Sequence, residues 1–92
     1  MKYELLFTRS YTRRATLFLR RHPELRGQYR KTLELLELNP FHPSLRLHKL
    51  SGPYAGLHSV SINLSYRITL QFLFVDRQIV PVDVGSHDQV HH

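Results

Sequence analysis

The second half of the chain alternates between apolar and polar side chains, and this alternation limits the folds open to it. The pattern runs through four segments separated by turn residues: 45–50, 58–64, 66–74 and 78–87. Successive side chains of a β-strand point to opposite faces of its sheet, so alternation of this kind predicts strands. Four such strands would form a sheet with one apolar face and one polar face.

Sorting each segment by parity predicts which side chains lie on each face. The apolar face is expected to carry His58, Val60, Ile62, Leu64, Tyr66, Ile68, Leu70, Phe72, Phe74, Val80, Val82 and Val84. The polar face is expected to carry Arg46, His48, Ser61, Arg67, Asp83 and His87. Because histidines change charge near neutral pH and gather here with arginines, the polar face is the candidate functional surface.

The first half of the chain predicts a short strand and two helices. Residues 3–8 form the strand candidate, and Ser10 is suited to cap the helix that follows. Pro23 ends that helix and suits the first turn of a second one, which Asn39-Pro40 ends. The predicted order β-α-α-β-β-β-β is an α+β fold, in which a two-helix hairpin covers one face of a mainly antiparallel, twisted sheet.

Length and composition restrict the possible functions. The 92 residues suit a single domain, residues 1–92, with 89–92 as a loose tail. The chain has no cysteine, which excludes disulfides and thiolate metal sites and fits the cytoplasm. No apolar run approaches the ~20 residues of a membrane span, so no membrane partner is expected. The formal net charge of +6 favours a polyanionic partner, either nucleic acid or an acidic protein.

Two interpretations remain open for the charged side chains. Arg67 lies in mid-strand, and it is either a solvated arginine, paired with Asp83, or a functional group. The arginines of the first helix either form a solvated face or contact phosphates or an acidic partner. His48 and His87 share the polar face, but they lie on separate strands, and neither a metal site nor a cofactor is predicted. His58 has apolar parity and is expected to be partly buried and structural.

The order of elements and several short motifs together resemble a known family. The motifs are His48-Lys49-Leu50-Ser51-Gly52, then Gly56, Tyr66-Arg67-Ile68 and Val84-Gly85-Ser86-His87. In this order and spacing they are similar to the RelE/ParE toxin superfamily, in particular its YafQ and YoeB branches. Members of these branches are toxins of type II toxin–antitoxin pairs, which cut mRNA in the ribosomal A site and are silenced by an antitoxin. The resemblance therefore implies three partners: a cognate antitoxin, the ribosome and mRNA.

The resemblance also implies roles for individual residues. His48 matches a functional histidine of the YafQ pattern, Arg67 the catalytic arginine of the YoeB pattern, and His87 the C-terminal catalytic histidine of both. Tyr66 stands where the YafQ pattern has a functional tryptophan. Ser61 and Ser65 depart from that pattern, which has a histidine and an aspartate there, and His91 replaces a C-terminal aromatic residue.

The predicted activity is a metal-independent, ribosome-dependent mRNA endonuclease that uses the RNA 2′-OH as nucleophile. Arg67 is expected to stabilise the phosphate, His87 to be the general acid, and His48 to be the base or a phosphate binder. The predicted substrate contacts are Arg46, Lys49, Tyr66, Ser61 and Asp83. Two alternatives are a ParE-like inhibitor of DNA gyrase that acts by binding, and an inactive homologue that only binds an antitoxin. The combination of His48, Arg67 and His87 favours the nuclease.

Overall fold

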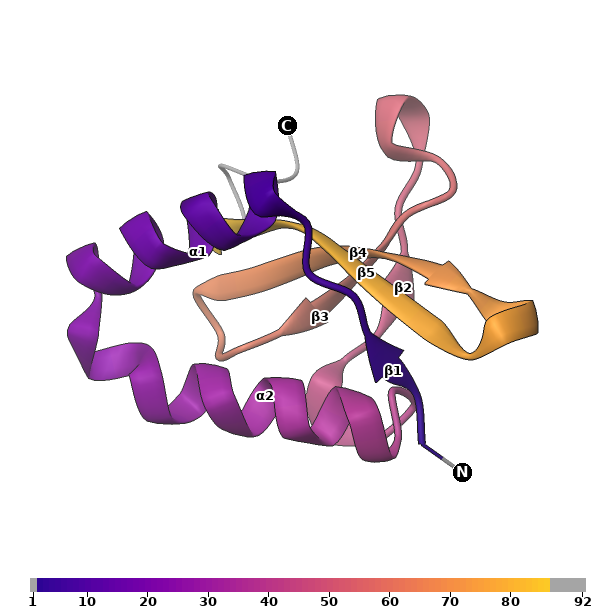
Figure 1. Ribbon diagram of the computed structural model, residues 1–92, viewed down its shortest axis with the longest axis horizontal. Coiled ribbons are helices and arrows are strands. Elements are labelled where there is room, and N and C mark those ends of the chain that lie inside the picture. Colours follow the sequence, from indigo (N-terminus) through magenta and orange to yellow (C-terminus); the bar gives the residue numbers. More distant parts are fainter. Residues whose placement is uncertain (1, 87–92) are drawn as a thin grey trace.

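The computed structural model describes residues 2–86 of the chain (Figure 1). His87, the predicted general acid, and the predicted tail at 89–92 lie outside the described residues. The helices are α1 (Arg9–Arg21) and α2 (Arg26–Leu38). The strands are β1 (Glu4–Leu5), β2 (His48–Lys49), β3 (His58–Ser61), β4 (Tyr66–Leu73) and β5 (Gln78–Ser86). Neither helix is long and apolar enough to cross a lipid bilayer.

The strands form one sheet in the order β1-β5-β4-β3-β2, in which only the β1–β5 pair is parallel. The two helices, joined by a 3₁₀ turn at Pro23–Leu25, form a hairpin beside the sheet, and α1 lies along β5 (Figure 1). This arrangement confirms the predicted α+β fold with a mainly antiparallel sheet and a two-helix hairpin.

The core lies between the helical hairpin and the apolar face of the sheet. Its most deeply buried members come from both layers: Tyr11 and Leu36 from the helices, and Val60, Ile68, Leu70 and Ile79 from the strands. The hydroxyls of Tyr11 and Tyr29 meet at 2.7 Å and tie the two helices together inside this core. Burial, and then the neighbouring Tyr29, raise the pKa of the Tyr11 hydroxyl well above its ordinary value, so it stays neutral.

Strand β5 departs from the predicted parity because it contains a β-bulge. Thr69 is opposite Asp83 while the next residue of β4, Leu70, is opposite Pro81, so Val82 is an extra residue in β5. The extra residue reverses the alternation of buried positions along β5. Before Val82 the odd-numbered Ile79 and Pro81 are buried, and after it the even-numbered Val84 is buried. The prediction that Val80 and Val82 share the apolar face with Val84 is therefore wrong.

Strands β2 and β3 are shorter than predicted, since local turns replace their ends. Residues Pro43–Leu45 form a 3₁₀ turn, and Arg46 has a left-handed backbone with φ of 49°, which prevents strand pairing before His48. After Ser61, the side chain of Asn63 accepts hydrogen bonds from the next two backbone N–H groups, of Ser65 at 2.8 Å and Tyr66 at 2.9 Å.

Two exposed residues that were predicted for the apolar face consequently lie outside the strands. Leu64 is 84% exposed in the turn between β3 and β4, and Phe74 is 55% exposed in a 3₁₀ turn at the end of β4. Both were assigned by extending the alternation past the point at which strand pairing ends.

The start of the first helix also differs from the prediction. Strand β1 is only Glu4–Leu5, and α1 begins at Arg9, so Ser10 lies inside the helix. The cap is Thr8, whose Oγ1 accepts the backbone N–H of Tyr11 at 3.0 Å. The second helix ends at Leu38 with Asn39 as its C-cap, as Asn39-Pro40 predicted.

Candidate functional site

The site is built around Arg67, which projects from β4 on the face opposite the core. The antiparallel register places Ser61 opposite Arg67, and Ser59 opposite both Thr69 on β4 and His48 on β2. Side chains that face each other across neighbouring strands are close enough to interact. The register therefore brings Ser59, Ser61 and His48 to one guanidinium.

The guanidinium of Arg67 is held at each of its nitrogen atoms. Its Nε donates to Ser59 Oγ at 2.5 Å, and its Nη1 donates to Ser61 Oγ at 2.9 Å. Its Nη2 donates to the carbonyl oxygen of Arg46 at 3.2 Å and to His48 Nδ1 at 3.1 Å. Within residues 2–86, these four contacts use four of the five N–H groups of Arg67 and fix the plane of its guanidinium, which leaves one Nη1 N–H for a ligand.

The contact with Arg67 determines which ring nitrogen of a neutral His48 carries the proton. A guanidinium can only donate, so His48 Nδ1 accepts this hydrogen bond and the proton of the neutral ring is on Nε2. The same Nδ1 lies 3.3 Å from the carbonyl oxygen of Arg46. A proton on Nδ1 would therefore be donated to Arg46, and the hydrogen bond from Arg67 would be lost. The two tautomers of His48 would therefore give two hydrogen-bonding arrangements, and only one of them uses this Nη2 N–H of Arg67.

The positive charge of Arg67 is not neutralised within residues 2–86. No carboxylate among these residues forms an ion pair with Arg67, and Asp83 instead accepts the backbone N–H of Val84 at 2.9 Å. Desolvation by burial, and then the nearby Arg46, lower the pKa of Arg67 below its ordinary value. A half-buried cation without a counter-ion among residues 2–86 is a favourable position for an anionic ligand.

Four of the sequence-predicted residues therefore meet in one cluster: Arg46, His48, Ser61 and Arg67. Arg46 enters it through its backbone carbonyl, which its left-handed conformation turns toward Arg67. Ser59 completes the cluster and was given no role from the sequence. The signal in the sequence that could have found Ser59 is that it is a small hydroxyl residue two positions before Ser61 and so has the same strand parity.

Two other predicted residues, Lys49 and Asp83, lie elsewhere. Lys49 is opposite His58, which puts it on the other face of the sheet from His48. Asp83 borders a hollow of about 220 Å³ beside α1, together with Arg14 and Arg21. His87 lies outside the described residues, so its role stays a prediction.

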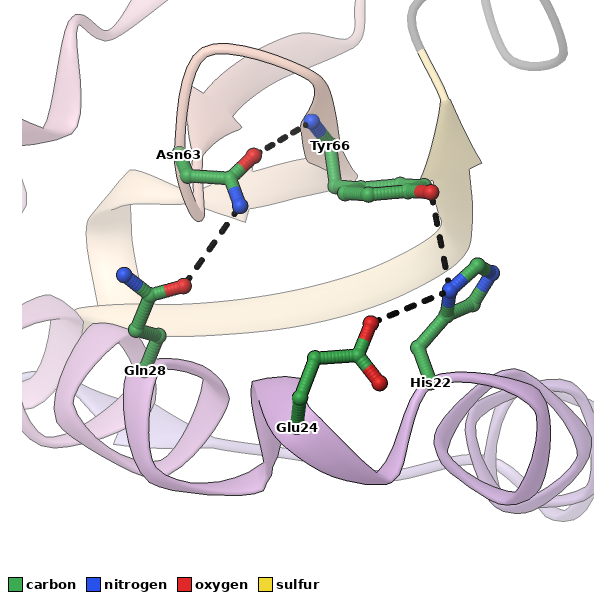
Figure 2. A network of polar contacts seen from close by, with 5 residues as sticks. All are labelled: His22, Glu24, Gln28, Asn63 and Tyr66. Atoms are coloured by element: carbon green, nitrogen blue, oxygen red, sulfur yellow. Dashed lines mark hydrogen bonds and ion pairs between the residues drawn. The ribbon is translucent and has the colours of Figure 1, made fainter.

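Tyr66 is separated from Arg67 by the sheet itself, because adjacent residues of a strand face opposite ways. Its ring packs against Phe18 and His22, with centroid separations of 5.3 and 4.8 Å. Its hydroxyl lies 3.5 Å from His22 Nδ1, which in turn lies 3.6 Å from a carboxylate oxygen of Glu24 (Figure 2). This network joins the end of the sheet to the junction of the two helices.

The described part of the chain, residues 2–86, contains no group of three or more histidine, aspartate or glutamate side chains arranged to hold a metal ion. The chemistry that this cluster supports is recognition of an anion, in particular a phosphate, by a fixed guanidinium beside an imidazole.

The fold defines a class: it is the fold of the RelE-like toxins, with a two-helix hairpin against a mostly antiparallel five-stranded sheet. Among the similar solved structures is YafQ from E. coli strain BL21(DE3), which superposes with a TM-score of 0.79 at 13% identity over 99% of this chain and 100% of that chain. The sequence motifs indicated the YafQ and YoeB branches, and the predicted fold resemblance is confirmed.

Two further structures extend the comparison. The E. coli DinJ–YafQ toxin–antitoxin complex matches with a TM-score of 0.77 and 15% identity, covering all of both chains. The YoeB/ParE toxin from Agrobacterium tumefaciens matches with a TM-score of 0.70 and 16% identity over 91% of this chain and 98% of that chain. No protein-family model and no curated protein sequence matches this chain. At these identities the likeness establishes a common fold.

Proposed function

We propose that this chain is the toxin of a type II toxin–antitoxin pair and that it cuts mRNA on the ribosome without a metal. The observation that carries the proposal is Arg67, a cation without a counter-ion within residues 2–86, which two serines, a backbone carbonyl and His48 hold in place. The fold that this chain has in common with YafQ and YoeB/ParE toxins supports the same reading.

The proposed reaction uses the 2′-OH that RNA carries beside each phosphate. The 2′-oxygen attacks the phosphorus, the bond from phosphorus to the 5′-oxygen breaks, and a 2′,3′-cyclic phosphate and a 5′-hydroxyl result. Arg67 stabilises the charge that develops on the phosphate oxygens. The proton of the 2′-OH goes to a base, and the departing 5′-oxygen takes a proton from an acid.

His48 is suited to be the base because of its alternative tautomer. When its Nδ1 carries the proton and donates it to the carbonyl oxygen of Arg46, its Nε2 carries the lone pair that can accept the proton of the 2′-OH. The same change releases an Nη2 N–H of Arg67, which can then bind the phosphate as a two-pronged donor. We propose His87 as the acid, and Arg46 as a phosphate contact together with Ser61.

The proposed partners are an antitoxin, the ribosome and mRNA, in the cytoplasm. A chain with a formal net charge of +6 attracts polyanions, both ribosomal RNA and an acidic protein segment. Toxin–antitoxin complexes are among the structures with this fold, including the DinJ–YafQ complex and RelBE2 from Mycobacterium tuberculosis.

A translation system with purified ribosomes tests the proposal. The protein is added to a translated mRNA, and cuts are mapped by primer extension. We expect cuts that need ribosomes, that persist in the presence of a chelator such as EDTA at a level that leaves ribosomes intact, and that disappear in Arg67→Ala. The matched control is Arg9→Ala, which removes an exposed arginine at the start of α1 and should cut like the parent. Inhibition of gyrase supercoiling without any mRNA cut would instead support the ParE-like alternative.

A further inference from the structure

A groove lies beside helix α2 and is bordered by two residues of the Arg67 cluster. Two adjoining hollows form it, with volumes of about 290 and 410 Å³, and Gln28, Ser44, Ser61 and Ile62 border both of them. Lys31 borders the first hollow, and Arg46 and Asn63 border the second. We call this the α2 groove. Its volume lies in the range of sites that hold small organic ligands.

The α2 groove shares two bordering residues with the proposed catalytic cluster. Ser61 and Arg46 border it, and the same two residues accept hydrogen bonds from Arg67 Nη1 and Nη2 at 2.9 and 3.2 Å. A polymer whose phosphate is bound at Arg67 would therefore place its next unit at the mouth of this groove.

The charge of the groove favours a polyanion. The two hollows are bordered by the cations Lys31 and Arg46, and no carboxylate is among the residues that border them. Exposed positive charges of this kind hold the backbone of a nucleic acid without regard to its sequence.

Two side-chain amides face each other across the groove, Gln28 from α2 and Asn63 from the β3–β4 turn (Figure 2). The oxygen of Asn63 is committed to the backbone of Ser65 and Tyr66, which fixes the orientation of its amide. Its nitrogen reaches Gln28 Oε1 at 3.4 Å, a long contact that a ligand can replace. Within residues 2–86, Gln28 Nε2 has no hydrogen-bond partner.

We propose that the α2 groove binds the nucleotide next to the phosphate held by Arg67, and that Gln28 reads the edge of its base. A side-chain amide presents a donor beside an acceptor, the pattern needed for paired hydrogen bonds to a base edge, and unstacked bases of single-stranded RNA are read in this way. The exposed Leu64, at the border of the groove, offers an apolar contact for the face of the base. This inference rests on the proposed function and adds to it a residue that determines specificity.

Cut-site mapping with three variants tests the inference. Messages that differ only in the base beside one cut site are cleaved on ribosomes, and initial rates are compared. The parent should prefer one or two of the four bases, and Gln28→Ala should reduce that preference by about tenfold while cutting continues, as expected for loss of one base-reading pair. Lys31→Ala should slow cutting at all four bases by a similar factor.

The matched control is Glu34→Ala, which removes an exposed side chain of the same length from α2 outside the groove and should keep the parent's preference. Gln28 is exposed, so thermal unfolding of the variant should match that of the parent.

The possible failures are distinguishable. If the parent cuts mRNA and Gln28→Ala has the same rates and the same base preference, the inference is wrong while the proposed function stands. If Gln28→Ala and Lys31→Ala leave cutting unchanged but weaken the complex with an antitoxin, the groove binds a protein and the inference is again wrong. If the parent makes no ribosome-dependent cut, the proposed function and the inference both fail.

Discussion

Arg67 and Tyr66 are neighbours in sequence, yet the structure uses them in opposite ways. Around Arg67, four hydrogen bonds of 2.5 to 3.2 Å fix a cation that no carboxylate within residues 2–86 neutralises. Around Tyr66, ring packing dominates, and the polar contacts with His22 and between His22 and Glu24 are 3.5 and 3.6 Å long (Figure 2). The first region is arranged to receive an anion, and the second joins the sheet to the helices.

The largest contrast is expected from the same substitution in both regions. His48→Ala removes the proposed base and should slow ribosome-dependent cutting by about 10²–10⁴-fold, the usual contribution of a general base, with little change in the unfolding midpoint. His22→Ala removes a ring that packs on Phe18 and Tyr66, so it should lower the unfolding midpoint while the folded protein cuts at the parent rate.

Single-turnover cutting and thermal unfolding of these two histidine variants give the comparison. A His48→Ala protein that cuts at the parent rate would show that His48 is not the general base. A His22→Ala protein that is as stable as the parent but inactive would show that His22, at the junction of the two helices, takes part in cutting.

A smaller effect is expected at Ser59, which holds Arg67 by its Nε. Ser59→Ala should reduce the rate constant of cutting by about tenfold with little change in half-saturating concentration, because it loosens the guanidinium without removing it. Ser59→Thr keeps the hydroxyl and should restore much of the rate. Ser65→Ala, in the exposed turn, is the matched control and should cut like the parent.

A purely structural role for Ser59 predicts a different pattern. If Ser59→Ala lowers the reduced rate of Arg67→Lys by the same factor as it lowers the parent rate, Ser59 does not act through Arg67.

Tyr66→Phe should have a small effect on stability and none on cutting. It removes only the long hydroxyl contact to His22, so the free energy of unfolding should fall by about 0.5 kcal/mol or less in urea denaturation. The sequence resemblance assigned Tyr66 to RNA binding, and a clear loss of cutting by well-folded Tyr66→Phe would support that assignment against the placement seen here.

The smallest effect is a dependence of stability on pH through His58. Burial first, then Lys49 and His48, lower the pKa of His58 below its ordinary value of 6.5. The folded state therefore binds this proton less readily than the unfolded state, and stability should fall as the pH drops below about 6.5 toward the folded pKa. Denaturation of the parent and of His58→Leu between pH 7 and pH 5 should show a shallower fall for the variant, and equal slopes would contradict this account.

The alternation within each strand was sufficient to predict the polar face of β3 and β4. Because parity is a local property, Ser61 and Arg67 could be assigned to one face without knowing how the strands pair. The bond from Arg67 to Ser59 could not be assigned, since it depends on the register between two strands, which neither strand's pattern contains.

The wrong predictions for the sheet also arose because the pattern of one strand does not show bulges or the points at which pairing ends. The bulge at Val82 inserts one residue, and it reverses every assignment that counts through it, as for Val80. The turns at Arg46 and Asn63 end strands that the alternation alone would have continued. The long contacts around Tyr66 are tertiary, and the order of residues along the chain gives no direct sign of them.

The most direct test of the central claim is the rate at which Arg67→Lys cuts ribosome-bound mRNA in a single turnover. Lysine keeps the positive charge, but it cannot reach Ser59, Ser61 and the phosphate together with a planar set of donors. We predict a rate lower by about 10²–10³-fold than that of the parent, with ribosome binding and unfolding midpoint preserved. A rate close to that of the parent would show that a diffuse positive charge suffices, and it would contradict the role assigned to the fixed guanidinium.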